Sequence, residues 1–480
     1  MAGIGFELRK IFNKGGILRT IEGAAYASAV TVGPVVMVIT TLLLMYNVFH
    51  FADVAYTERE LLSATILYCF IFSLVVISLL DAVLSRSIAD AIYGNVIHRV
   101  MAIYRLGLML VLPIGSALGL GFGWRMLTVG GLDPVYVLFS YLLFMSLILV
   151  FYAMIYMSAI KEYKFIALAY LLGMVLALIC SLIMIFWFQI ARYRAILYSY
   201  SIGFMFIAAF LNMLVHRYYP KKAVGYGQIF RELWHNKALA LTNFCYILGL
   251  YISNFIVWNS SIRVVVANVF VNAPPYDMAT CLAMFSNITA MIIFVVQVET
   301  NFHERHQHFC EMLMGGSKKA IDTSKRIVFR TLWQQVLYMA ELQLIITVIN
   351  FLIAMVTLRL LGFGGLTLTF YPTLTVSFYA TFLMYAAIVS LYYFDDKFGS
   401  LLASVTFLIV SAVGTVFMVF YVDRYEYYGM GMLIGAVSGW IVTFLRLNYL
   451  EHHIDTYIFC KGYLIPREKG SRPKSLVYHK

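Results

Sequence analysis

Residues 134–160 read PVYVLFSYLLFMSLILVFYAMIYMSAI, and this run of 27 residues contains no charged side chain. A helix needs roughly 20 apolar residues to cross the hydrocarbon core of a bilayer. The run is therefore long enough to span a membrane, and its unbroken hydrophobicity favours a helix over a barrel strand, which alternates in polarity. The composition agrees, because 62% of the chain is hydrophobic, 12% is charged and the mean hydropathy is +0.85.

Similar apolar runs recur along the whole chain, with little sequence between them. They predict an all-α integral membrane protein with about twelve transmembrane helices. The predicted spans are 23–50, 61–84, 106–126, 134–160, 164–189, 195–216, 238–262, 279–301, 333–358, 373–394, 398–422 and 428–450.

The positive charges set the expected orientation. With both termini placed in the cytoplasm, 28 of the 35 Lys and Arg residues fall on the cytoplasmic side and 7 fall outside. Because cytoplasmic loops are enriched in Lys and Arg, we expect an N-in, C-in topology in the cytoplasmic (inner) membrane. Contact of basic loops with anionic lipid also accounts for the net charge of +12, so we expect no nucleic-acid partner.

A polar and basic connection divides the spans into two sets of six. We expect a cytoplasmic amphipathic segment at 1–22, a first lobe at 23–216, a cytoplasmic linker at 217–237, a second lobe at 238–450 and a basic cytoplasmic tail at 451–480. An even number of spans in each lobe gives the two lobes the same orientation, as in transporters with parallel repeats. The first segment would lie along the inner leaflet or dock a partner.

Several strings of the chain resemble the Pel exopolysaccharide transporter (PelG) family, in the expected order. The opening string is the most specific, and the resemblance covers nearly the whole chain. The strings are MAGIGFELRKIF at 1–12, LSRSIADAIYG at 84–94, FRELWHN at 230–236, PPYDM at 274–278 and VETNFHERHQHFCEMLMGG at 298–316. The His-rich HERHQH within the last string departs from the family pattern.

The resemblance implies a fold and a function. Members of the multidrug/oligosaccharidyl-lipid/polysaccharide flippase superfamily, to which this family belongs, form two six-helix lobes around a central cavity that opens alternately to each side. The resemblance also implies export of the Pel polysaccharide, an N-acetylgalactosamine-rich glycan of the biofilm matrix, across the cytoplasmic membrane. The implied partners are a cytoplasmic glycosyltransferase and a membrane-bound cyclic-di-GMP receptor of a Pel synthase complex.

Ionisable side chains inside a membrane are costly and tend to face a cavity or a partner. Glu341, about two turns into its predicted span, is the first candidate for the substrate path or for proton coupling; the alternative is a structural carboxylate paired with another helix. Asp81 and Glu299 lie near the inner ends of their spans, where either would pair with a basic residue and serve in gating. Arg446, near the inner end of the last span, is expected to reach lipid headgroups rather than the glycan.

The predicted span 238–262 is the most polar. Its Asn243, Tyr251 and Asn254 share one helical face, and Asn287 and Gln297 follow in the next span. Amides bond sugar hydroxyls and aromatic rings stack on sugar faces, so these residues are candidates for the substrate path. The alternative use is hydrogen bonding between helices, which contributes about 0.6 kcal/mol per bond in membranes.

Other patterns indicate structure rather than chemistry. Gly33 and Pro34 interrupt the first span, where they predict a kink that is either static or lets a lobe rearrange. The six cysteines show no CxxC spacing, and HERHQH lacks the HExxH spacing of zinc proteases, so we expect no disulfide, metal or cofactor. No catalytic residue is assigned, and the chain is not expected to be an enzyme.

Three other functions remain open at this stage. A flippase for lipid-linked oligosaccharides would need several cations in its cavity to bind pyrophosphate, and cations are nearly absent from the centres of the spans. A glycan polymerase or ligase would present a large external domain, whereas the external loops are short. A non-transporting scaffold of a glycan synthase complex is compatible with the sequence. No GxxxxGK[ST] string is present, so energy from a Walker-type ATP site is not expected.

Overall fold

The apolar runs form long helices in the computed structural model. It describes residues 33–94, 96–160, 163–219, 226–297, 302–360 and 365–464. The helices before the predicted linker are α3 (Gly33–Val48), α4 (Tyr56–Tyr93), α5 (His98–Thr128), α6 (Pro134–Ile160), α7 (Tyr163–Phe186) and α8 (Arg192–Tyr218). Those after it are α10 (Lys237–Val257), α11 (Pro274–Gln297), α12 (His303–Gly315), α13 (Lys318–Leu360), α14 (Gly365–Tyr393), α15 (Lys397–Phe417) and α16 (Met430–Leu464).

Ten of the described helices are long and apolar enough to cross a membrane. Helices α3 and α11 occupy the two other predicted spans, and the described part of α3 has 16 residues. The prediction of an all-α membrane protein of about twelve spans is therefore confirmed. The expected N-terminal segment 1–22 and basic tail lie mostly outside the described residues, as does the start of the first span.

Several helices are longer than the apolar runs that predicted them. Helix α4 continues to Tyr93, and α13 begins at Lys318, well before its predicted span. The predicted linker contains the short helix α9 (Tyr226–His235), and α12 lies between the predicted spans 279–301 and 333–358. Hydropathy marks only the part of a helix that is in contact with lipid, so it cannot show where a helix continues into water.

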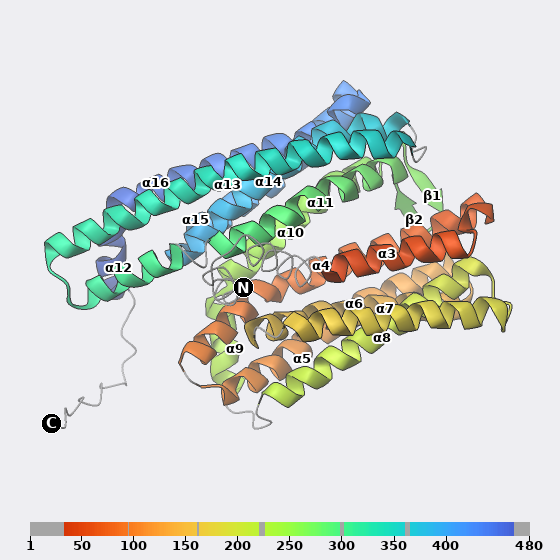
Figure 1. Cartoon of the computed structure of the whole chain (residues 1–480), viewed down its shortest axis with the longest axis horizontal. Coiled ribbons are helices and arrows are strands. Elements are labelled where there is room, and N and C mark those ends of the chain that lie inside the picture. The colour runs from red at the N-terminus through yellow and green to blue at the C-terminus, as the bar shows by residue number, and fades with distance from the viewer. Residues whose placement is uncertain are drawn as a thin grey trace, which may run out of the picture.

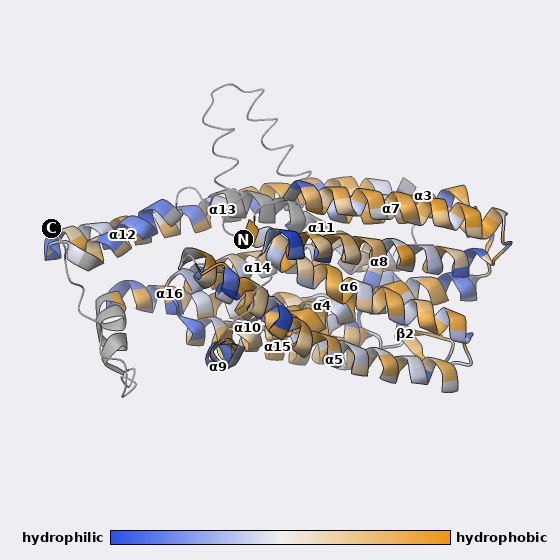
Figure 2. Ribbon diagram, turned by 90° about the horizontal axis from the view of Figure 1, so that it is seen from below, coloured by the Kyte–Doolittle hydropathy of each residue, from blue (hydrophilic) through white to orange (hydrophobic). Residues whose placement is uncertain are grey.

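The helices form two groups, α3–α8 and α10–α16, which lie one below the other in Figure 1. Within each group the helices pack on one another, as α6 does on α8 and α15 on α16. Between the groups, α4 packs along α10. Hydrophobic residues cover most of the length of both groups, whereas hydrophilic residues gather on α9 and α12 (Figure 2).

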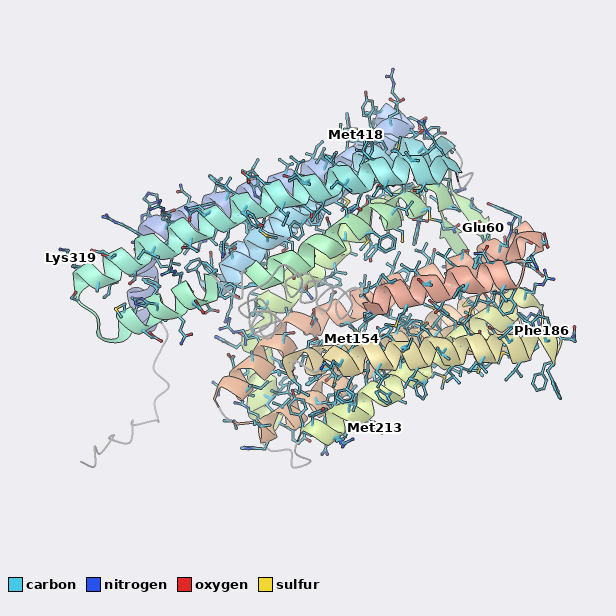
Figure 3. All side chains as sticks on the ribbon, viewed as in Figure 1. Glu60, Met154, Phe186, Met213, Lys319 and Met418 are labelled. Atoms are coloured by element: carbon cyan, nitrogen blue, oxygen red, sulfur yellow. The ribbon has the colours of Figure 1, made fainter. Side chains whose placement is uncertain are left out.

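A small β-hairpin connects α10 to α11. Strand β1 (Val264–Val266) pairs antiparallel with β2 (Phe270–Asn272), and Ala267 and Asn268 at its turn have φ of 50° and 55°. Two successive positive φ values are typical of the tight turns that join twisted strands. We call this end of the molecule, where Glu60 and Phe186 also lie, the hairpin end, and the opposite end, where Lys319 lies, the basic end (Figure 3).

Small residues allow the closest helix contacts. Gly431, Gly435 and Gly439 follow one another at every fourth position of α16 and face α15, where a Cβ on Gly435 would collide with Ser411. Gly173 of α7 and Gly203 of α8 approach each other in the same way in the first group. Because lipid is as apolar as a Leu side chain, helix association in membranes depends on such close packing.

We predict that Gly435→Val lowers the free energy of unfolding by about 1–3 kcal/mol, because the added side chain forces α16 away from α15. Gly121→Val is the matched control: Gly121 is also inside a helix, and a Cβ there meets no other atom within 4 Å. Thermal unfolding of both variants in detergent measures the effect. Equal stabilities of the two variants would contradict the packing role assigned to Gly435.

Candidate functional site

The contact between α4 and α10 is where the first helix group meets the second. We use the term seam for this contact together with the hairpin at one end and the segments 395–397 and 231–237 at the other end. A substrate that passes between the two groups must pass beside the seam. The side-chain contacts along the seam therefore determine which end of the molecule is held closed.

Aromatic rings join the groups toward the hairpin end. The ring of Tyr68 stacks on that of Trp258, with centroids 5.0 Å apart and planes 7° apart, and Phe72 stacks on Phe255 at 5.8 Å and 10°. Tyr68 and Phe72 are neighbours on one face of α4 because they are four residues apart. The Tyr68 hydroxyl also donates to the carbonyl of Val271 in the hairpin, at 2.7 Å. Each aromatic pair contributes about 0.5–1.5 kcal/mol beyond the area that it buries.

A buried carboxylate organises the second group beneath these rings. Asp277, in the first turn of α11, accepts hydrogen bonds from Asn254 Nδ2 at 2.7 Å, from Trp258 Nε1 at 2.9 Å and from the backbone N–H of Ala273 at 3.0 Å. A carboxylate near the N-terminus of a helix is also stabilised by the helix dipole. These bonds fix the Trp258 ring in the orientation in which it stacks on Tyr68.

Some polar atoms at the hairpin end have no partner. Asn254 Oδ1, Asn272 Oδ1 and Glu60 Oε2 are buried and accept no hydrogen bond from any residue that the structure describes. Glu60 belongs to α4, and the other two belong to α10 and β2. Buried acceptors without partners are costly unless water or a ligand supplies a donor. The hairpin end of the seam therefore contains buried acceptors that could bond hydroxyl groups only if the two groups part there.

Toward the basic end, a second carboxylate lies on the seam. Asp81 of α4 is 3.4 Å from Asn243 Nδ2 of α10, and the same amide donates to the carbonyl of Ser78 at 3.1 Å. The Asp81 carboxylate is also close enough to Tyr385 to interact with it electrostatically. The ring of Tyr385 packs on Tyr246 of α10 at a centroid distance of 5.1 Å. Amide, carboxylate and phenol groups thus meet at this level of the seam.

An ion pair crosses the groups at the basic end itself. Arg86 Nη1 of α4 lies 2.7 Å from Asp395 Oδ1, in the turn between α14 and α15, and both side chains are about one-third exposed. Lys397 Nζ donates to Asn236 Oδ1 at 2.7 Å. Arg86 and Asn236 belong to the strings at 84–94 and 230–236, so two segments far apart in the sequence meet here.

The structure separates the residues that the sequence placed on one face of span 238–262. Asn243 contacts α4, whereas Asn254, about three turns away, contacts Asp277 of α11. Tyr251 is buried in the core of the second group. Asn287 bonds to helices on both sides, because it donates to the carbonyl of Phe378 at 2.9 Å and accepts from Gln343 at 2.9 Å.

The other candidates lie in different surroundings. Glu341 is exposed on α13. Arg446 does not extend toward headgroups as expected: it bonds Asp396, which also caps α15 through the N–H of Gly399. Gly33 and Pro34 are the first described residues of α3, so the expected kink cannot be compared with the residues before them. Glu299 and the Gln297 side chain lie outside the described residues.

Sequence reasoning missed the residues that hold the seam together. Asp277 stands in the PPYDM string, where an acid just after two prolines is a signal for the first turn of a helix. Asp395 is one of two adjacent acids at the end of α14. Tyr68, Trp258 and Phe255 resemble the many other aromatic residues of the chain. Among the described residues, no three His, Cys, Asp or Glu side chains are placed to hold a metal ion.

Comparison with known proteins places this architecture among transporters. The family profile described as "PelG: Putative exopolysaccharide Exporter (EPS-E)" matches residues 1–459. No curated protein sequence matches the chain.

Solved structures show the same fold at low sequence identity. A MATE transporter of Vibrio cholerae is similar at 15% identity and TM-score 0.58, over 89% of this chain and 97% of that one. A MOP-superfamily transporter from Pyrococcus furiosus has 11% identity and TM-score 0.57, over 89% and 96%. An inward-facing MATE-family multidrug transporter has 11% identity and TM-score 0.55, over 83% and 92%.

We predict that Asn254→Asp lowers the free energy of unfolding by roughly 3 kcal/mol. The substitution replaces the amide that donates to Asp277 with a second buried carboxylate. Asn259→Asp in the turn after α10 is the control, since the exposed Asn259 side chain donates to the carbonyl of Phe255 at the end of that helix and to no other described residue. Thermal unfolding of the purified variants measures the difference. If the two variants were equally stable, Asp277 would not depend on Asn254.

Proposed function

Because this chain belongs to the PelG family of exopolysaccharide exporters, we propose that it carries the N-acetylgalactosamine-rich Pel polysaccharide across the cytoplasmic membrane between its two helix groups. The positive-inside bias puts the basic end in the cytoplasm and the hairpin end outside. The polymer would enter from a cytoplasmic glycosyltransferase at the basic end and leave at the hairpin end as biofilm matrix.

The observation that carries this proposal is the composition of the seam. Its two ends are held by different, separable contacts: stacked rings at the hairpin end, and a partly exposed ion pair between Arg86 and Asp395 at the basic end. Neither set of contacts is covalent, and either set can separate while the helices stay intact. The two groups can therefore part at one end while they stay joined at the other, which is the geometry that alternating access needs.

The chemistry of the seam favours a glycan over a lipid-linked pyrophosphate. Between its ends the seam holds Asn243 and Tyr246, whose amide and ring suit hydroxyl groups and sugar faces, and Asp81, whose carboxylate would repel a pyrophosphate. The unpartnered acceptors Asn254 Oδ1 and Asn272 Oδ1 are also suited to hydroxyl donors. The flippase for lipid-linked oligosaccharides is therefore the less favoured alternative.

We predict that export stops when the hairpin end is held closed. Phe72→Cys and Phe255→Cys, combined in a chain without its six native cysteines, place two thiols across the seam. A short crosslinker with two methanethiosulfonate groups joins them through disulfides that a reductant can break. Surface polysaccharide, measured with a lectin for N-acetylgalactosamine in a strain that lacks the native chain, should fall on bridging and recover on reduction. Intracellular polymer should rise in parallel.

Two controls separate transport from assembly. Phe139→Cys with Tyr198→Cys bridges rings 4.2 Å apart within the first group, and this bridge should leave export unchanged. The single-cysteine variants show the effect of the reagent alone. Unchanged export with the seam bridged would refute alternating access, and normal export from a strain without the chain would refute the transport function itself.

The partner subunits would be recognised in part through α13. The Tyr379 hydroxyl, near the middle of α14, donates to the carbonyl of Ala340, so Glu341 lies near mid-membrane. Leu337, Tyr338 and Ile345 around it are all exposed. No hydrogen bond or ion pair joins Glu341 to another described residue. Because a carboxylate facing hydrocarbon is costly, we infer that a partner's transmembrane helix supplies a Lys or Arg to it.

We predict that Glu341→Gln weakens recovery of the membrane partner in a pull-down roughly tenfold, as expected for an ion pair worth about 1.4 kcal/mol. The stability of the variant itself should not fall, because a neutral amide is less costly in lipid. Tyr338→Phe, on the same face, is the control and should keep the partner. Full partner recovery together with lost export would instead place Glu341 on a water-filled path.

A further inference from the structure

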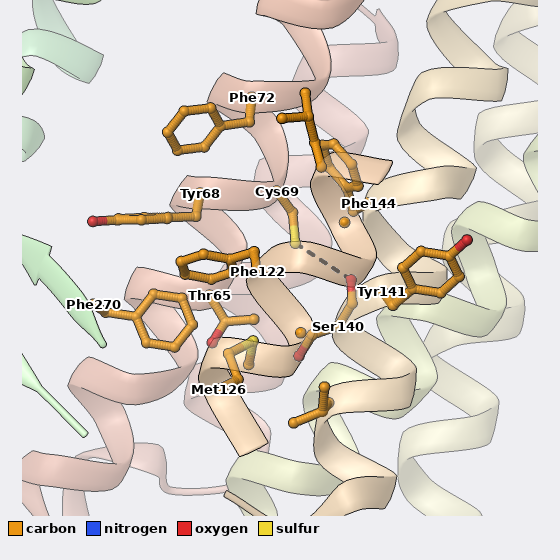
Figure 4. A pocket seen from close by; sticks show the side chains of 14 residues that line it. Thr65, Tyr68, Cys69, Phe72, Phe122, Met126, Ser140, Tyr141, Phe144 and Phe270 are labelled. Carbon is orange, nitrogen blue, oxygen red and sulfur yellow. Dashed lines mark hydrogen bonds between the residues drawn. The ribbon is translucent and has the colours of Figure 1, made fainter. Parts of the chain in front are cut away.

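An apolar cavity lies in the first helix group, behind two of the rings that stack across the seam. It has a volume of about 200 Å³ and lies between α4, α5 and α6, with the ring of Phe270 from β2 at one side (Figure 4). Its α4 wall consists of Thr65, Tyr68, Cys69 and Phe72. For comparison, an apolar cavity of about 150 Å³ is large enough to bind benzene.

The cavity accepts only an apolar ligand, because its few polar groups already have partners. Cys69 Sγ donates to the carbonyl of Ser140 at 3.5 Å, as the dashed line in Figure 4 shows, and Ser140 Oγ donates to the carbonyl of Tyr136 at 2.8 Å. Thr65 Oγ1 donates to the carbonyl of Leu61 at 2.7 Å. A lining of this kind stays dry unless an apolar group fills it.

The packing of α5 on α6 forms one side of the cavity. Gly119 and Gly123 face α6 at close range: a Cβ on Gly119 would lie 2.9 Å from the ring of Tyr141, and one on Gly123 would lie 3.3 Å from Val137. These glycines draw α5 onto α6, and the side chains of Leu118 and Phe122 remain on the cavity side.

Leu118, on the α5 wall of the cavity, is 54% exposed, whereas Phe72 on the α4 wall stacks on Phe255 and faces the seam. Thr65 is about 13 Å along α4 from Tyr56 at the hairpin end, so the cavity lies in the half of the membrane toward that end. Exposed apolar residues at this depth face hydrocarbon, and the nearest apolar ligand is a lipid chain.

We propose that this cavity binds an acyl chain of a phospholipid from the leaflet at the hairpin end, and that the bound chain supports the closed seam. The support follows from two shared side chains. Tyr68 and Phe72 line the cavity, and the same rings stack on Trp258 and Phe255 of the other helix group. An acyl chain bound in the cavity limits how far both rings can move away from Trp258 and Phe255. This lipid site does not depend on which polymer the protein exports.

Photolabelling of the full chain in nanodiscs tests the site. The probe is a phosphatidylglycerol with a diazirine in its acyl chain, and the labelled peptides are identified by mass spectrometry. We expect label concentrated in residues 65–72 and 118–126. Cys69→Phe fills the cavity and should abolish this label, whereas Leu138→Phe, exposed on α6 outside the cavity, should retain it. Label spread evenly over the lipid-facing helices and unchanged by Cys69→Phe would overturn the proposal.

Two further measurements keep the test decisive. If Cys69→Phe does not fold, Leu118→Trp narrows the exposed rim without entering the core, and it should reduce the same label. A photoreactive polyprenyl phosphate in a parallel sample distinguishes the two sources of an apolar chain. Label from the polyprenyl probe alone would assign the cavity to an isoprenoid carrier and overturn the phospholipid assignment.

Discussion

In lipid, every backbone N–H and C=O must find its hydrogen bond within the protein, and this constraint shapes the whole molecule. It forces the chain into helices and leaves helix association to close packing and a few polar contacts. The glycines of α16 against α15, and the pair Gly173 and Gly203, provide the close packing within the groups. Between the groups, stacked rings, an amide and an ion pair accompany the aliphatic side chains of Leu67, Ile71 and Val75, which pack from α4 on the core of the second group.

The two ends of the seam differ in their exposure to water. At the basic end, the Arg86–Asp395 pair is partly exposed, and such pairs contribute about 0–1 kcal/mol. At the hairpin end, the rings of Tyr68 and Trp258 stack closely, and the Asp277 carboxylate holds the Trp258 indole in place. The named contact at the basic end is therefore the weaker of the two. In the proposed orientation, this end is where a newly made polymer arrives.

The sequence predicted the fold well because the length of an apolar run is a direct physical signal. Residues 134–160, for example, coincide with α6. The hairpin was not predicted because each strand has three residues, too few for an alternating pattern to appear. The site was harder to predict, because periodicity gives the face on which a residue lies but not its neighbour. Asn243 and Asn254 share a face, yet one bonds across the seam and the other bonds within its own group.

This difference between the two asparagines bears on how the groups separate. Parting at the basic end must break the bond from Asn243 to the Ser78 carbonyl together with the Arg86–Asp395 pair. Parting at the hairpin end must break the ring stacks and the bond from Tyr68 to Val271, but not the bond from Asn254 to Asp277, because both of those residues move with the second group. In the proposed alternating access, Asp277 would therefore keep Trp258 oriented whether the seam is open or closed. The Trp258 ring can then stack on Tyr68 again in the orientation that it already has. The side chain therefore loses little conformational entropy when this end closes.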